Sequence, residues 1–114
     1  MKNILQIIIL SLIIITHTSA EKRDIELKNL FKELKISQNS KAIEIENKIW
    51  EIWMTHPSED RRGYRLTELL AQGSSLINNR NFDKAYGILS QIILEDPKWA
   101  EAWNKRATLL YMMG

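Results

Sequence analysis

The stretches LTELLAQGSSL at residues 66–76 and AEAWNKRATLL at residues 100–110 carry the same side-chain pattern and decide the fold. In each stretch a bulky, a small and a bulky residue stand at i, i+4 and i+7, and the second set follows the first after 34 residues. The two sets are Leu69, Gly73 and Leu76, then Trp103, Ala107 and Leu110. Each set falls on one helix face, and a period of this length predicts a helix-hairpin repeat whose units pack on their neighbours.

Five helices are predicted after residue 20, because apolar residues keep helical spacing there and no stretch alternates as a strand does. Polar turns and prolines separate them. Asp96 and Pro97 suit the N-cap and the first position of the last helix. The predicted segments are 24–36, 42–56, 66–78, 82–94 and 97–113. The sequence therefore predicts an all-α fold of antiparallel helical hairpins.

Size and composition limit the classes of function. The chain has 114 residues, which is enough for one small domain. Its 26% charged and 45% apolar residues are ordinary for a globular protein. The net charge is +2 with both signs interspersed, so no basic stripe indicates a nucleic-acid partner. The absence of cysteine excludes disulfides and thiolate metal sites.

Residues 1–20 have the organisation of an export signal. Lys2 is followed by an apolar run over residues 4–15 and by the small-residue site Thr18-Ser19-Ala20. Cleavage is expected between Ala20 and Glu21, which would make the mature protein periplasmic or secreted, with no stable membrane span. The alternative is an uncleaved membrane anchor through residues 4–15, although a span needs about 20 apolar residues.

The 34-residue pattern resembles the tetratricopeptide repeat (TPR), which combines bulky and small positions with a later alanine, an apolar residue and a proline. The matching positions are Leu69, Gly73, Leu76, Ala85, Leu89 and Pro97, then Trp103, Ala107 and Leu110. Small residues at Gly73, Ala85 and Ala107 would let paired helices approach closely. A generic helical bundle with an accidental recurrence is the alternative interpretation.

The resemblance implies a right-handed stack of about five helices. Residues 21–57 would form a cap-like N-terminal hairpin, residues 58–65 a connector and residues 66–99 one full repeat. Residues 100–114 would form the first helix of a second, incomplete repeat.

In TPR proteins the first helix of each repeat lines a concave surface that holds peptides. The corresponding residues here are Thr67, Leu70, Ser74, Ile77 and Asn78, then Glu101, Asn104, Thr108 and Tyr111. Leu70 stands where carboxylate-binding members carry a lysine, which argues against capture of a C-terminal carboxylate. The expected partner is an unidentified protein or peptide of the cell envelope.

The sequence predicts no catalytic, cofactor or metal site. His56 is the only histidine after the signal segment, and we expect it at a helix end. An enzyme or metal hypothesis would depend on His56 with Glu59 and Asp60, but the two acidic residues fall in a polar connector flanked by arginines, which disfavours a metal site. Trp53 is expected to pack inward and Trp50 to lie at a partly exposed edge, with an aromatic ligand-binding pair as the alternative.

The leading hypothesis is an exported, non-catalytic protein–protein interaction module. The second is a truncated, non-functional remnant of a longer periplasmic TPR protein, because the second repeat ends at Gly114. The third is a self-associating bundle, in which two copies pair through the unpartnered last helix. Both alternatives rest on apolar side chains that this helix is expected to expose: Trp103, Leu110, Tyr111 and Met112.

Overall fold

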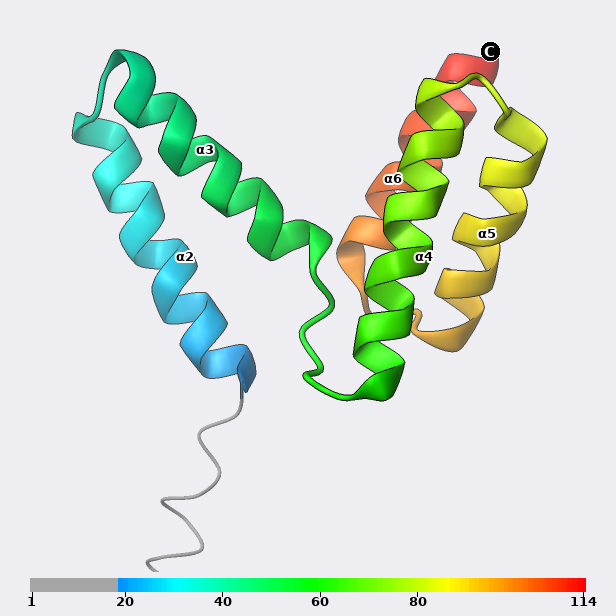
Figure 1. The fold of residues 1–114 in the computed structure, drawn as a ribbon, viewed down its shortest axis with the longest axis horizontal. Helices are drawn as coiled ribbons and strands as arrows, with labels where there is room; N and C mark the ends of the chain where they lie inside the picture. Colours follow the sequence, from blue (N-terminus) through cyan, green and yellow to red (C-terminus); the bar gives the residue numbers. More distant parts are fainter. Residues whose placement is uncertain (1–18) are drawn as a thin grey trace, which may run out of the picture.

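The computed structural model describes residues 19–114, which fold into five α-helices with no β-strand among them (Figure 1). The helices are α2 (Ser19–Ile36), α3 (Asn39–Met54), α4 (Arg61–Asn78), α5 (Phe82–Glu95) and α6 (Ala100–Met113). The prediction of an all-α fold of stacked antiparallel hairpins is confirmed. Most of the predicted signal segment, residues 1–18, lies outside the described residues, whereas Ser19 and Ala20 begin α2.

Helices α2 and α3 pack against each other as an N-terminal hairpin (Figure 1). Helix α3 buries Ile45 and Ile49, one helical turn apart. Helix α2 contributes three half-buried leucines with helical spacing: Leu27, Leu30 and Leu34. Asn39 starts α3 with a φ of 54°, a left-handed conformation that asparagine adopts more readily than most residues.

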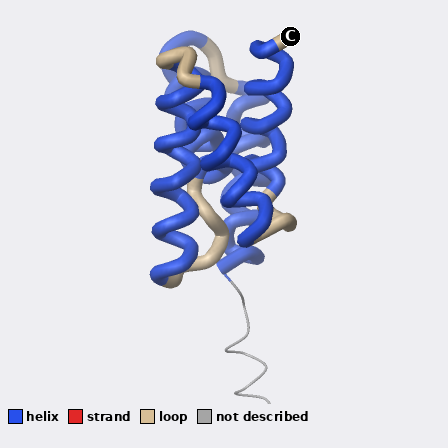
Figure 2. Tube along the Cα trace, turned by 90° about the vertical axis from the view of Figure 1, so that its right-hand side faces the viewer, coloured by secondary structure: helices blue, strands red, loops and turns tan. Residues whose placement is uncertain are grey.

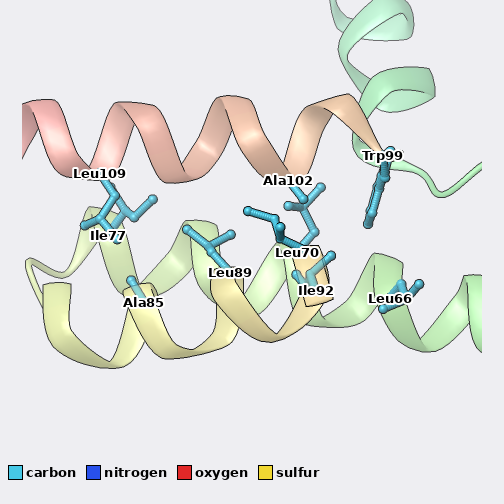
Figure 3. Close-up of a cluster of buried hydrophobic side chains, with 10 residues drawn as sticks. Leu66, Leu70, Ile77, Ala85, Leu89, Ile92, Trp99, Ala102 and Leu109 are labelled. Atoms are coloured by element: carbon cyan, nitrogen blue, oxygen red, sulfur yellow. The ribbon is translucent and has the colours of Figure 1, made fainter. Parts of the chain in front are cut away.

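Helices α4, α5 and α6 enclose the main core (Figure 3). Its buried side chains come from all three helices and from the turn before α6: Leu66, Leu70, Ile77, Ala85, Leu89, Ile92, Ile93, Trp99, Ala102 and Leu109. The expected close approach at Gly73 is present, because a Cβ added there would lie 3.0 Å from a δ-carbon of Leu89. Figure 2 shows the helices standing side by side from a second direction, and Figure 1 shows that α2 and α3 are inclined to α4, α5 and α6.

Helix α4 begins at Arg61, five residues before its predicted start. The Asp60 carboxylate accepts a hydrogen bond of 2.7 Å from the N–H of Gly63 and so acts as the N-cap. Gly63 is required here, because a Cβ would overlap the carbonyl oxygen of Ser58. The predicted connector over residues 58–65 is therefore wrong in its second half, and the link between α3 and α4 covers residues 55–60.

Helix α6 begins at Ala100, so the prediction that Asp96 and Pro97 start it is wrong. Asp96 instead ends α5 and organises a turn: its carboxylate accepts from the Lys98 N–H at 3.1 Å, and its carbonyl accepts from the Trp99 N–H at 3.3 Å. This local pattern is an Asx turn, which competes with helix initiation.

The two sets of repeat-signature residues have different surroundings. In α4, Gly73 is buried while Leu69 and Leu76 are half-buried against the core. In α6, Trp103 is 45% and Leu110 is 49% exposed. The expected exposure of apolar side chains on the last helix is confirmed, since Tyr111 and Met112 are exposed as well.

Candidate binding groove between the N-terminal hairpin and helix α6

A groove of about 340 Å³ lies between the N-terminal hairpin and the start of α6. Side chains from three separate helices and from the turn before α6 line it: Arg23, Trp53, Trp99, Ala100, Glu101 and Asn104. The volume is at the small end of the range for ligand pockets, enough for one or two side chains of a bound segment.

Trp53 forms the α3 side of this groove and belongs to an aromatic cluster. The ring centroid of Trp53 lies 6.0 Å from that of Phe31 and 5.2 Å from that of Trp50, the latter edge to face. Trp53 is half-buried and Trp50 is exposed, which confirms the predicted orientation of the pair. Lys105 of α6 places its ammonium 5.7 Å from the centroid of Trp50, so a cation–π contact links α3 to α6.

Polar groups surround the opening of the groove. Glu101 is largely buried and accepts from the Asn104 amide at 3.3 and 3.4 Å, with the Lys105 ammonium 3.7 Å away. The Arg23 guanidinium donates to the carbonyl oxygen of Thr55. Burial lowers the pKa of Arg23 from its ordinary value against the raising effect of Asp24, and the side chain stays cationic at neutral pH.

Trp99 is the most buried of the groove residues, and its ring packs against that of His56. The two rings meet edge to face with centroids 4.9 Å apart. The indole Nε1 of Trp99 is buried and has no hydrogen-bond acceptor among residues 19–114. A buried donor without an acceptor costs about 1–3 kcal/mol, so this group favours any rearrangement or ligand that supplies one.

The residues predicted to line a concave surface separate into two groups. Glu101 and Asn104 lie in the groove. Leu70 and Ile77 do not line an accessible surface, because α6 covers that face of α4 and packs Ala102 and Leu109 on it (Figure 3). Leu70 and Ile77 are therefore not candidate contact residues.

The other predicted lining residues lie outside the groove. Thr67 is occupied by two hydrogen bonds, from the His56 N–H and to the Gly63 carbonyl. Ser74 and Thr108 donate to backbone carbonyls of their own helices. Asn78 and Tyr111 are exposed near the ends of α4 and α6.

Three groove residues were not predicted from the sequence: Arg23, Trp99 and Ala100. Trp53 was named only in the alternative of an aromatic ligand-binding pair with Trp50. The assembly of the groove depends on how the N-terminal hairpin meets α6, which no local pattern encodes.

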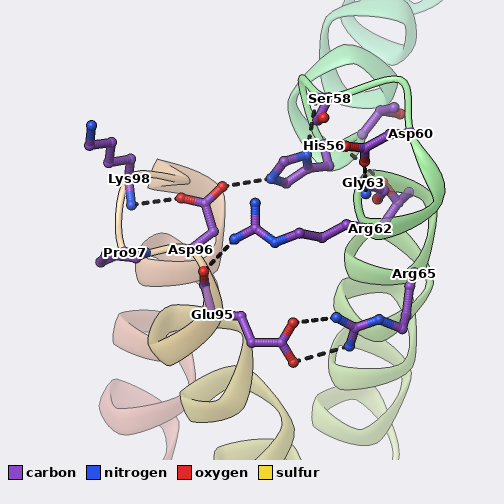
Figure 4. A network of polar contacts seen from close by, with 12 residues as sticks. His56, Ser58, Asp60, Arg62, Gly63, Arg65, Glu95, Asp96, Pro97 and Lys98 are labelled. Atoms are coloured by element: carbon purple, nitrogen blue, oxygen red, sulfur yellow. Dashed lines mark hydrogen bonds and ion pairs between the residues drawn. The ribbon is translucent and has the colours of Figure 1, made fainter.

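His56 lies in a hydrogen-bonded network beside the groove (Figure 4). Its Nδ1 accepts from the Ser58 N–H at 3.0 Å, and its Nε2 lies 2.7 Å from the Asp96 carboxylate. An Nδ1 that accepts leaves the proton on Nε2, which donates to Asp96. Burial opposes ionisation of Asp96, but hydrogen bonds from His56 and Lys98 outweigh it, and the pKa of Asp96 lies below its ordinary value.

An enzyme or metal hypothesis would depend on His56 with Glu59 and Asp60, and these three side chains have different surroundings. Asp60 caps α4, and Glu59 is exposed. His56 was predicted at a helix end, but α3 ends two residues earlier, at Met54. The His56 side chain is buried. Both imidazole nitrogens are engaged, so His56 joins two loops rather than presenting a free base.

A second polar contact joins the start of α4 to the end of α5 (Figure 4). The Arg65 guanidinium donates to both carboxylate oxygens of Glu95, and Arg62 donates to the Glu95 carbonyl. The hydrogen bonds from Arg65, supported by Gln91, lower the pKa of Glu95 to about 2. The paired hydrogen bonds from Arg65 to the Glu95 carboxylate, which we call the fork, hold the end of α5 next to the Asp96 turn.

Comparison of the chain with protein-family models, curated proteins and solved structures finds no match. Within residues 19–114, no three carboxylate or imidazole side chains gather as a metal site would require. No helix in this part of the chain is long and apolar enough to cross a membrane.

Proposed function

We propose that the protein is a non-catalytic protein–protein interaction module of TPR type, which holds a short segment of another cell-envelope protein. The groove between the N-terminal hairpin and α6 carries this proposal. It combines two features of a recognition site: an apolar wall with Trp53 and Trp99, and polar groups at its opening, Arg23 and Asn104.

The chemistry of the groove suits an extended or turn-forming peptide. Trp53 offers a broad apolar surface for one side chain, and tryptophan is enriched among residues that dominate binding energy. The Asn104 amide and the Arg23 guanidinium can pair with backbone carbonyls of the ligand. Because the groove is small, the affinity is expected to be modest.

Export is part of the proposal and rests on the pattern of residues 1–20. Purification from cells followed by sequencing of the N-terminus tests it. We expect the mature chain to begin at Glu21 and to be released with the periplasmic fraction. A chain that retains Met1 and stays with the membranes would support the anchor through residues 4–15 instead.

Site-directed photo-crosslinking in cells tests the groove. A photoreactive amino acid replaces Asn104 in the groove or Leu94, an exposed residue of α5 outside the groove lining. We expect a discrete crosslinked envelope protein from position 104 and none from position 94. The crosslink should disappear in the Trp53→Ala background, while Trp103→Ala, a matched tryptophan truncation elsewhere, should leave it unchanged.

Two outcomes would contradict the proposal. One is identical crosslinking from positions 104 and 94. The other is a crosslink at position 104 that persists in Trp53→Ala. Circular dichroism of each variant establishes that the helices are intact, and Arg23→Ala provides a second groove variant that leaves the aromatic cluster whole.

A further inference from the structure

Helix α6 presents a second apolar surface, separate from the groove. We call Trp103, Ala107 and Leu110 the outer stripe. All three are exposed, and the small Ala107 stands between two bulky side chains. A partner that covered this stripe would gain roughly 25 cal/mol of free energy for each Å2 of apolar surface removed from water.

The chain itself shows what covers an equivalent stripe. Of the residues 34 positions earlier, Gly73 lies against α5, and Leu69 and Leu76 on the same helix face are half-buried against the core. A Cβ at Gly73 would be 3.0 Å from one carbon of Leu89 and 3.7 Å from Ile88, so the two helices are in close contact there. Helix α5 buries a small residue followed by larger ones at i, i+4 and i+7: Ala85, Leu89 and Ile92.

The packed face of α6 is a different one. Helix α6 uses Ala102 and Leu109 to contact the core. Their counterparts on α4, 34 residues earlier, are Glu68 and Ser75, which are polar and exposed. Helix α6 therefore has one apolar face that is covered and one that is not, and the uncovered face repeats the face of α4 that binds α5.

Charge indicates the kind of partner. Arg106 lies beside the outer stripe, with its guanidinium 4.8 Å from the Trp103 ring centroid and 5.9 Å from that of Tyr86. It donates to Ser90 at 3.4 Å and forms no ion pair with any described residue. The counterpart of Arg106 on α4 is the neutral Gln72. A second copy docked symmetrically about Ala107 would bring two Arg106 side chains together, which is unfavourable.

We propose that the outer stripe binds an amphipathic helix of a partner protein, one that carries a carboxylate opposite Arg106. The partner helix runs antiparallel to α6, as α5 does to α4, and presents a small residue and two larger apolar residues at i, i+4 and i+7. The binding of this helix is independent of the groove and does not require the proposed function to hold.

Two synthetic peptides test the proposal. Both have the sequence of residues 81–95, the α5 segment; one carries glutamate and the other lysine at the exposed positions of Lys84 and Gln91. We expect the acidic peptide to bind the purified protein about tenfold more tightly than the basic one, a difference typical of one well-placed charge pair. Arg106→Gln, which installs the residue of α4, should remove most of that difference.

The site of binding is measured by NMR and by substitution. Chemical-shift changes should centre on the Trp103 indole and the Ala107 amide, not on Asn104. Leu110→Ser should weaken binding by about tenfold or more, the scale of one lost interface contact, while Leu94→Ser, which alters an exposed leucine on α5, should leave it unchanged.

Three results would overturn the proposal. The first is equal binding of the two peptides, and the second is binding unaffected by Leu110→Ser. The third is a dimer in sedimentation equilibrium that Leu110→Ser dissociates, because a second copy would then be the occupant. Melting curves for each variant show whether the fold is retained, and Ala107→Glu offers a second variant at an exposed site.

Discussion

His56 Nε2 lies 2.7 Å from an oxygen of Asp96, 40 residues away, and this contact joins the link after α3 to the turn before α6. The imidazole also packs edge to face on Trp99. Because Trp99 lines the groove, His56 helps to set the position of the N-terminal hairpin relative to α6. The groove therefore depends on a contact outside it.

The first prediction concerns this contact. His56→Ala should lower the free energy of unfolding by about 1–3 kcal/mol, because it removes the donor to a partly buried carboxylate and leaves space beside Trp99. Urea unfolding followed by circular dichroism measures the change. Glu59→Ala, at an exposed residue nearby, should stay within about 0.5 kcal/mol of the unaltered protein. Equal effects of the two substitutions would refute the structural role of His56.

The second prediction concerns the N-cap of α4. Asp60→Ala should lower the melting temperature, because the Gly63 N–H loses its acceptor. Asp60→Asn keeps a side-chain oxygen at this position and should recover most of the loss. Thermal melts at neutral pH measure both variants. If asparagine is as damaging as alanine, charge rather than capping accounts for the role of Asp60.

The third prediction concerns acid stability. The pKa of Glu95 is lowered from 4.5 to about 2 by Arg65 and Gln91, so its carboxylate stabilises the folded state above its unfolded pKa. This contribution should be lost as the pH falls from about 4.5 to about 2. Glu95→Gln should flatten the dependence of the urea midpoint on pH over that interval. Because Glu95 and Arg65 are partly exposed, added salt should weaken the effect.

Glu68→Gln serves as the control for the acid experiment. Glu68 is an exposed carboxylate of α4 and pairs with no cation among the described residues. The Glu68→Gln substitution should leave the dependence of the urea midpoint on pH unchanged. A control that flattens the slope as much as Glu95→Gln would mean that total charge, and not the fork with Arg65, governs acid unfolding.

The helix interiors could be predicted from the sequence, because the spacing of residues such as Leu66, Leu70, Ala85 and Leu89 reflects burial directly. The helix ends could not. Asp96 and Pro97 form a good local start signal, yet a histidine 40 residues earlier takes one carboxylate oxygen and a turn uses the other.

The candidate site was predictable only in part, for a related reason. Glu101 and Asn104 were found because their helix and its register could be predicted. Leu70 was misplaced because sequence periodicity identifies an apolar face but not the helix that covers it. Arg23 and Trp53 reach the groove from segments whose contact with α6 depends on the whole fold.

The fourth prediction compares two helical glycines, of which only Gly73 occupies a small position of the 34-residue pattern. Both lie inside helices, Gly73 in α4 and Gly87 in α5. A Cβ at Gly73 would be 3.0 and 3.2 Å from carbons of Leu89, whereas a Cβ at Gly87 meets nothing within 4 Å. Gly73→Ala should therefore destabilise, because Leu89 is fully buried and overpacking that costs about 1–3 kcal/mol outweighs the gain from alanine in a helix. Gly87→Ala should stabilise by about 0.5–1 kcal/mol, because alanine restricts the unfolded chain and suits a helix.

Denaturant unfolding of both glycine variants measures the difference, and a third variant locates its cause. Leu89→Ala in the Gly73→Ala background removes the side chain that the new methyl group meets. If overpacking is the cause, the two substitutions together should destabilise less than the sum of their separate effects, because the smaller residue 89 leaves room for the methyl group. Strict additivity would show that α4 and α5 are not in close contact at Gly73, and it would remove the template on which the partner helix for α6 is based.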